Sequence, residues 1–359
     1  MTGMGERAYA YARACGIAGK SFVGRRTAAL RPLSRLSELD RLIFGPAARE
    51  LPERELLADL ERRLARRSAA AILSVIGAYK KPPEPLLLLL RAYEYADLKN
   101  ALAAAGTGAA GSGTKAGAAA GTETEAAAGS RPVFTDLGRF GTVRFAAWPD
   151  LGAMLEGGEF EFLLEKEKNR PPRLRGESGG VSLETALDRR YYRELWKGIA
   201  RLRRGDRRAA ELITAEEIAL RNCAWVLRLR TYYGMGAEEA AAHLITIDGA
   251  PALTEDAAAA LEFPLDNREP WTGWKRIRFL NDESGGSWRA SPRYFQNAAA
   301  EYLYRLSLRH FHRRPSSLDS VFCFIKLKQF EEDLLTSAAE GLGMGLGGTE
   351  VLAMLERTL

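Results

Sequence analysis

The sequence has 359 residues, of which 46% are hydrophobic and 27% charged, a composition typical of a folded globular protein and unlike a disordered chain. A chain of this length exceeds what one hydrophobic core usually holds, so two or three domains are expected. The formal net charge is +6, and residues 1–50 carry nine arginines and lysines against four acids. Such a basic segment suits a nucleic acid, a membrane surface or an acidic protein, or is simply a solvated face.

The three cysteines are far apart in the sequence, which favours buried free thiols in a reducing compartment over disulfides: Cys15, Cys223 and Cys323. The start of the chain lacks the apolar core of a signal peptide. The longest apolar run, Leu86–Leu90, is far shorter than the roughly 20 residues that span a bilayer. We therefore expect a cytoplasmic protein that meets a membrane only through a partner.

Helix-forming residues dominate the chain and β-branched residues are sparse, so helices are expected almost throughout. In chain order they are predicted at 4–20, 34–44, 53–79, 85–105, 149–167, 183–204, 212–234, 237–247, 254–262, 292–312, 318–340 and 349–358. Ser182, Ser291 and Thr349 are placed to cap the helices that follow them. Residues 131–146 predict a short turn or hairpin. Residues 106–130 are low-complexity Gly, Ala, Ser and Thr, which predicts a flexible surface insert.

The helix at 212–234 has the clearest pattern. Thr214 and Glu217 have the spacing of a capping box, and Gly205-Asp206 would separate this helix from the one before it. The apolar stripe that follows is too wide for a helix lying on a surface, so this helix should be covered on most sides.

None of the motifs that would indicate catalysis or cofactor binding has the surrounding structure or spacing that its chemistry needs. Gly343-x-Gly345-x-x-Gly348 matches the letters of a dinucleotide-binding loop, but a helix precedes it where that chemistry needs a strand. His310 and His312 are two residues apart and point in different directions on a helix, so they cannot share a metal ion. The sequence predicts no catalytic residue, no metal site and no cofactor.

Three segments share a weak similarity that indicates a threefold internal plan. Asn100 and Asn222 each follow a leucine and a basic residue, and Asp333 holds a loosely corresponding place. The intervals between them predict three similar helical bundles. The expected division is a first bundle at 1–105, the insert at 106–131, a second bundle at 132–245 and a third at 246–359.

Segments along nearly the whole chain together resemble the C-type subunit of rotary V/A-type ATPases, the subunit d or AC39 family. They are AYARACGIAGKSFVG near the start, RAYEYADLKNAL at 91–102, LETALDRRYYREL at 183–195, EEIALRNCAWVLRLRTYYG at 216–234 and PSSLDSVFCFIKLKQFEEDLLTSAAEGL at 315–342. Two departures stand out: the insert at 106–130 is absent from the usual pattern, and Asp333 stands where the closing motif more often has Asn.

The resemblance implies an all-α fold of three bundles related by pseudo-threefold symmetry, forming a funnel-shaped body. It also implies a non-catalytic subunit on the inner face of the membrane that passes torque between ion translocation and ATP chemistry. The implied partners are the coiled-coil central shaft with its small companion and the membrane proteolipid ring, with no nucleic acid and contact with the membrane only through the ring.

Five residues are predicted to lie at an interface or at the seam between repeats: Asn100, Arg221, Asn222, Arg228 and Asp333. For Arg221, Asn222 and Arg228, packing within their own bundle is favoured over a contact with the rotor. Two other functions stay open at this point. A basic helical protein could bind nucleic acid, although its arginines alternate with glutamates and no recognition motif is present. A helical enzyme is also conceivable, although no nucleophile or base stands out.

Overall fold

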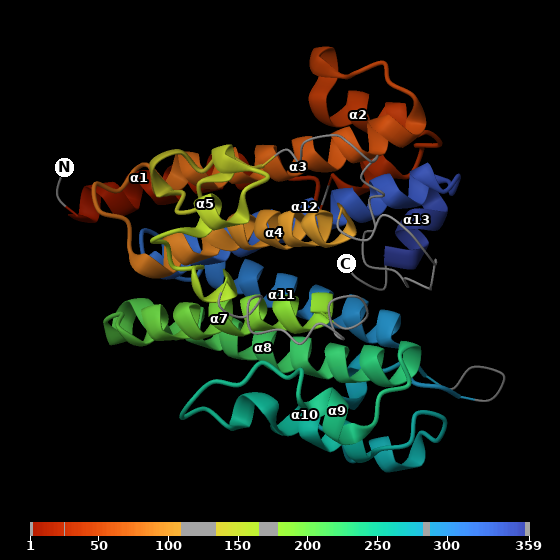
Figure 1. The fold of residues 1–359 in the computed structure, drawn as a ribbon. Coiled ribbons are helices and arrows are strands. Elements are labelled where there is room, and N and C mark those ends of the chain that lie inside the picture. The colour runs from red at the N-terminus through yellow and green to blue at the C-terminus, as the bar shows by residue number, and fades with distance from the viewer. Residues whose placement is uncertain (1–2, 25, 109–133, 165–178, 283–287, 356–359) are drawn as a thin grey trace.

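A computed structural model describes residues 3–24, 26–108, 134–164, 179–282 and 288–355 (Figure 1). Its longer helices are α1 (Gly3–Ala18), α2 (Leu36–Phe44), α3 (Glu53–Ile76), α4 (Glu84–Gly108), α7 (Gly179–Ala200), α8 (Arg204–Tyr232), α10 (Ala252–Glu262), α11 (Pro292–Phe311), α12 (Leu318–Gly343) and α13 (Gly348–Leu355). Two short helices are α5 (Leu151–Leu155) and α9 (Ala237–Ala241). These residues contain no strand, which confirms the predicted all-α class.

Helix α12 is the central element of the fold. It packs against α1, α3, α4, α8, α11 and α13. Every residue from Leu318 to Lys328 is buried, so this part of the helix is covered all round. In Figure 1 it lies between the helices of the N-terminal third and the green pair α7 and α8. Ser317 begins the helix, because its side-chain oxygen accepts a hydrogen bond from the backbone N–H of Ser320.

The hydrophobic core consists of three clusters of buried side chains. The largest joins α1, α4 and α7 to parts of α3, α8 and α12. The second lies between the C-terminal half of α8, α10 and the beginning of α11, and the third joins α2, α3, the end of α12 and α13. Helices α8 and α12 each run through two clusters, which ties the clusters rigidly together. The sequential division at 1–105, 132–245 and 246–359 and the funnel shape stay predictions.

Tryptophans hold the irregular segment between α10 and α11 in the second cluster. The ring centres of Trp271 and Trp274 are 5.1 Å apart, and those of Trp271 and Trp288 are 6.4 Å apart. The indole N–H groups all donate to backbone carbonyls. Trp271 donates to Pro264, Trp274 to Asp256 and Trp288 to Asn281. Burying these rings with their N–H groups satisfied allows a segment without regular helix to pack.

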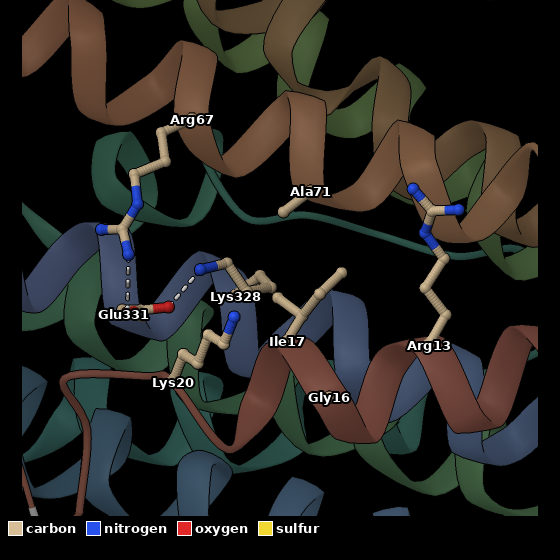
Figure 2. Close-up of a pocket in the computed structure, with 8 residues that line it drawn as sticks. All are labelled: Arg13, Gly16, Ile17, Lys20, Arg67, Ala71, Lys328 and Glu331. Carbon is tan, nitrogen blue, oxygen red and sulfur yellow. Dashed lines mark hydrogen bonds and ion pairs between the residues drawn. The ribbon is translucent and has the colours of Figure 1, made fainter. Parts of the chain in front are cut away.

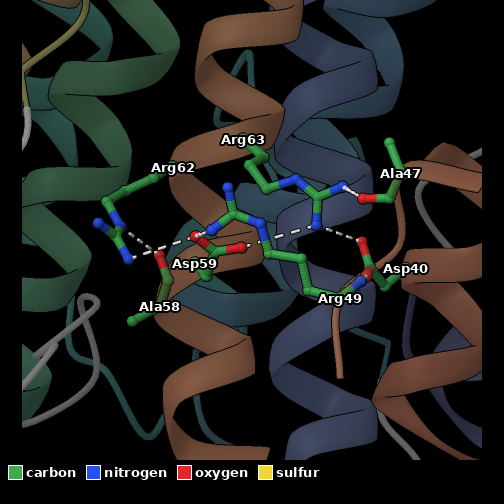
Figure 3. A network of polar contacts seen from close by, with 7 residues as sticks. All are labelled: Asp40, Ala47, Arg49, Ala58, Asp59, Arg62 and Arg63. Atoms are coloured by element: carbon green, nitrogen blue, oxygen red, sulfur yellow. Dashed lines mark hydrogen bonds and ion pairs between the residues drawn. The ribbon is translucent and has the colours of Figure 1, made fainter. Parts of the chain in front are cut away.

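A polar network fastens α2 to α3 (Figure 3). The fully buried carboxylate of Asp40 accepts hydrogen bonds from the backbone N–H of Arg49 at 2.7 Å and from Arg63 at 2.8 Å. Arg63 also donates to the carbonyl of Ala47 at 2.7 Å, and Arg49 donates to Asp59 at 2.8 Å. Because each buried charge has a partner, the network offsets the cost of removing these groups from water.

Several predicted helix boundaries were wrong. Thr214 is not a cap: α8 begins ten residues earlier, at Arg204, so Thr214 lies buried inside the helix and Gly205-Asp206 belongs to its first turn. Thr349 lies inside α13, and Ser182 lies inside α7. Ser291 does cap α11, since its side chain accepts from the N–H of Tyr294.

Two predicted segments in the middle of the chain differ from the structure. The helix expected at 149–167 is interrupted after α5, where Gly157 adopts a φ of 66° and turns the chain. The described part of 131–146 contains two short 3-10 turns, Gly138–Phe140 and Phe145–Ala147, in place of a hairpin. Most of the predicted insert at 106–131 lies outside the described residues. No helix in the described ranges has the length and apolar character of a membrane span.

Candidate functional site

The structure separates the five residues predicted to form an interface or seam. Asn100 is exposed on α4, whereas Asn222 on α8 is fully buried. Arg228 is half-buried, and its guanidinium lies 5.6 Å from the centre of the Trp225 ring. Arg221 on α8 and Asp333 on α12 are both exposed, and the positive charge of Arg221 acts to lower the pKa of Asp333. From this set, Arg221 and Asp333 therefore lie within electrostatic reach of each other.

Asn222 connects α8 to the chain between α9 and α10. Its side-chain amide donates to the carbonyls of Ile245 at 3.0 Å and Leu253 at 3.3 Å, and its oxygen accepts from the N–H of Ile245 at 2.8 Å. The two bonds to Ile245 satisfy both backbone groups of a buried residue that lies outside any helix, and the bond to Leu253 reaches the first turn of α10. Asn100, which shares the same local sequence pattern, has no such environment, so the pattern does not give the two residues the same surroundings.

Around Arg221 lies a group of polar side chains, the interhelical cluster, contributed by α4, α7, α8 and α12. Its members are Lys99, Asp188, Tyr192, Glu217, Arg221 and Lys326. Within the cluster, Lys326 forms an ion pair with Glu217 at 2.7 Å, although only 6% of the Lys326 side chain is exposed. Tyr192 is buried and donates to the other oxygen of Glu217 at 2.9 Å. The charge of Lys326 is thus compensated inside the protein.

The outer part of the interhelical cluster is open to solvent. Arg221 donates to the hydroxyl of Tyr192 at 3.2 Å, and its guanidinium is also 4.0 Å from Asp188. Asp188 accepts from Lys99 at 2.9 Å, which links α7 to α4. The Arg221 side chain is 42% exposed, so it has donor groups that can still bind a partner.

Two adjacent acids on α12, Glu332 and Asp333, extend the charged region toward α4. Tyr93 donates to Glu332 at 2.7 Å. Burial raises the pKa of Glu332 to about 7; the hydrogen bond from Tyr93 lowers this pKa and the charge of Asp333 raises it further. The surrounding helices desolvate Asp333 and raise its pKa to about 6, even though the side chain is reached by solvent. The positive charges of Arg221 and Lys326 partly oppose this rise in the pKa of Asp333.

A family model described as ATP synthase (C/AC39) subunit matches residues 173–353, which is half of the chain. The chain belongs to this family. A protein of Treponema pallidum (strain Nichols), described only as "Uncharacterized protein", is 27% identical over 347 residues, which cover 95% of this chain and 94% of the relative. The match places the chain in the family that its sequence segments resemble.

The part of this C/AC39-family chain that the model matches contains α7, α8, α11 and α12. Arg221, Asn222, Arg228 and Asp333 therefore lie in the matched region, and Asn100 lies outside it. Helices α1 to α4 also precede the match, and one of them, α4, supplies Lys99 to the interhelical cluster.

Sequence reasoning missed most members of the interhelical cluster. Glu217 was assigned to a capping box with Thr214, whereas in the structure it bonds to Tyr192 and Lys326. Lys326 lies in an apolar stretch of α12, and that setting was the one signal in the sequence, because a lysine buried on all sides needs an acidic partner. Sequence alone could not identify that partner, since it lies on another helix.

The same C/AC39-family chain has no described group of three or more His, Cys, Asp or Glu side chains placed to hold a metal ion. Cys223 and Cys323 are buried free thiols whose burial raises their pKa well above the ordinary value. Such thiols are protonated and inert toward nucleophilic chemistry.

Proposed function

We propose that this chain is the non-catalytic central-stalk subunit of a rotary V/A-type ATPase. In this role it sits on the membrane rotor ring, receives the foot of the central shaft and transmits torque between ion translocation and ATP hydrolysis or synthesis. Membership of the ATP synthase (C/AC39) subunit family is the observation that carries the proposal. The chain would lie on the inner face of the membrane and touch the bilayer only through the ring.

The packing of the body is consistent with a torque-bearing part. A subunit that transmits torque must resist bending, and close-packed interiors are stiff. Helices α8 and α12 each cross two hydrophobic clusters, so a force applied at one cluster is passed to the next along a continuous helix. Buried ion pairs such as Lys326–Glu217 further hold α12 against α8.

We place the contact with the shaft at the open part of the interhelical cluster. Arg221 and Asp333 offer opposite charges on two helices that pack together, α8 and α12, and both side chains are exposed. A surface with both signs of charge favours one orientation of its partner and disfavours others. The sequence favoured packing of Arg221 within its own bundle over a contact with the rotor, and this proposal takes the second of these alternatives.

Co-purification tests the role in the complex. The tagged chain, expressed in its own cell and extracted in mild detergent, should bring down a proteolipid ring and a coiled-coil shaft subunit. Recovery of neither would contradict the proposal. Tight nucleic-acid binding that weakens steeply with salt would point instead to the basic helical alternative.

A charge reversal tests the location of the shaft contact. Arg221→Glu should reduce recovery of the shaft subunit about tenfold or more, because an attractive charge becomes repulsive at an interface. Arg54→Glu is the matched control, since Arg54 is an exposed arginine on α3 with no ion pair to another described residue. Equal recovery with both variants would place the shaft contact elsewhere while leaving the role in the complex intact.

A further inference from the structure

A pocket of about 450 Å³ lies between α1, α3 and α12, away from the interhelical cluster (Figure 2). Its size is in the range of pockets that bind small organic molecules. Four basic side chains surround it: Arg13 and Lys20 from α1 and the turn that follows it, Arg67 from α3 and Lys328 from α12. One acid, Glu331, lines it with them.

Glu331 is occupied by partners inside the protein. Its carboxylate, with 1% of the side chain exposed, accepts from the backbone N–H of Phe22 at 2.9 Å and pairs with Lys328. Arg67 is 3.9 Å from the same carboxylate, as Figure 2 shows. The one carboxylate of the pocket therefore already faces two cations, Lys328 and Arg67, and Arg13 and Lys20 add two more.

Arg13 and Lys20 leave a surplus of positive charge on the α1 side of the pocket. Arg13 donates to the hydroxyl of Tyr9 at 3.2 Å, which is neutral, and both side chains are exposed. Within the described ranges, neither of them is ion-paired with a carboxylate. Like charges on one side of a pocket repel one another, and a bound anion would offset this repulsion.

The face of α1 that meets the pocket has a mixed character. Arg13, Gly16 and Ile17 have the spacing that places residues on one side of a helix, and Lys20 lines the pocket from the turn after α1. Between the two basic residues the lining is small and apolar, with Ile17 on α1 and Ala71 on α3. A Cβ built on Gly16 would have no atom within 4 Å, so the pocket is open above it. This combination suits an anion that carries an organic part.

We infer that this pocket binds a phosphoryl-bearing anion, with the phosphoryl oxygens at Lys20, Arg67 and Arg13 and any organic part against Ile17 and Ala71. Phosphoryl groups match this set because guanidinium groups bind them through paired hydrogen bonds and an ammonium group binds them as a compact charge. The net charge around the pocket is +3, from four cations and one carboxylate. This inference does not depend on the proposed role in an ATPase.

Titration of the full chain with inorganic pyrophosphate tests the inference, using calorimetry and the thermal unfolding midpoint at constant ionic strength. Ionic strength is held constant because salt screens exposed charges. The double variant Arg13→Gln/Lys20→Gln should bind pyrophosphate at least tenfold more weakly than the unmodified chain and show little rise in its midpoint. The matched control Arg54→Gln removes an exposed arginine from α3 about 20 Å from Arg67, at 1.5 Å per residue, and should bind normally.

A second variant keeps the test valid if the double variant fails to fold. Ala71→Glu puts a carboxylate among the four cations, where it should replace the bound anion and abolish pyrophosphate binding. Because the new charge is attracted by its neighbours, this variant should unfold at the same temperature as the unmodified chain or higher. Binding retained by Ala71→Glu would contradict the inference.

Two sources of the phosphoryl group are distinguished by vesicles. If the natural ligand is a lipid headgroup, phosphatidylcholine vesicles containing phosphatidic acid should sediment the unmodified chain and not the double variant, with pyrophosphate competing. If it is a free metabolite, pyrophosphate should bind and the vesicles should not. No binding to either probe, or equal binding by the unmodified chain, the double variant and Arg54→Gln, would overturn the inference.

Discussion

Two neighbouring glutamates on α12 lie in regions of opposite charge. Glu331 faces α1 and α3, where basic side chains outnumber it, and its oxygens are taken by Lys328 and the N–H of Phe22. Glu332 lies beside another acid, Asp333, with Tyr93 as its hydrogen-bond donor, and its pKa is raised to about 7. Two sides of the same turn of a central helix thus differ. On one side cations outnumber the single acid Glu331, and on the other two acids stand next to each other, so each side suits a different kind of partner.

The largest expected effect is the loss of Glu331. Glu331→Ala leaves Lys328 buried and unpaired, and removing one partner of a buried pair costs about 3–5 kcal/mol. Glu332→Ala should cost about 1 kcal/mol, since it removes a hydrogen bond with Tyr93 and no paired charge. Urea unfolding of both variants measures the difference. A loss for Glu331→Ala no larger than that for Glu332→Ala would show that the two surroundings do not differ as described.

A second comparison concerns the two asparagines that share a sequence pattern. Asn222→Ala should lower the free energy of unfolding by about 2–3 kcal/mol, because the buried backbone N–H and carbonyl of Ile245 lose their partner. Asn100→Ala should change it by less than about 0.5 kcal/mol, as expected at an exposed site. Thermal or urea unfolding provides the test. If Asn222→Ala folds with normal stability and the assembled motor is uncoupled, Asn222 serves function and not packing.

The raised pKa of Glu332 predicts a pH-dependent stability. Folding favours the protonated carboxyl, so this contribution is full below the ordinary value of 4.5 and is lost as the pH rises to about 7. Glu332→Gln does not titrate. As the pH rises through this window, the free energy of unfolding of Glu332→Gln should therefore increase relative to that of the unmodified chain, by about 3 kcal/mol at roughly 1.4 kcal/mol per pKa unit.

Urea unfolding at several pH values between 4.5 and 7.5 measures this gain. Glu255→Gln, at an exposed position on α10, is the control, and its free energy of unfolding should differ from that of the unmodified chain by the same amount at every pH. A constant difference between Glu332→Gln and the unmodified chain over the whole range would mean that Glu332 does not titrate in this window.

Local sequence patterns predicted the helices well where caps and breakers are unambiguous. Ser291 followed by Pro292 marked the beginning of α11, because both residues stabilise a first turn whatever lies around them. Thr214 and Glu217 also have the spacing of a capping box, but the helix start that they predicted was wrong. The preceding residues are also helical, so α8 begins at Arg204. A glycine near the beginning of a helix, such as Gly205, does not have to end one.

The candidate site was less predictable than the fold. Arg221 was selected as a polar residue of the helix at 212–234 and Asp333 from the internal similarity, yet their relative position depends on how α8 packs against α12. The pairing of Lys326 with Glu217 and the gathering of Arg13, Lys20 and Arg67 arise from tertiary packing between helices distant in sequence. Periodicity indicates which face of a helix is buried, but not which helix covers it.

Removing the chain from a purified, reconstituted V/A-type ATPase tests the proposed function most directly. Torque transmission requires the chain for coupling but not for ATP chemistry, so the depleted complex should still hydrolyse ATP and should lose ATP-driven ion transport into vesicles. Adding back the unmodified chain should restore transport, whereas Arg221→Glu should restore little and the control Arg54→Glu should restore it fully. Undiminished ion transport in the complete absence of the chain would contradict the proposed role.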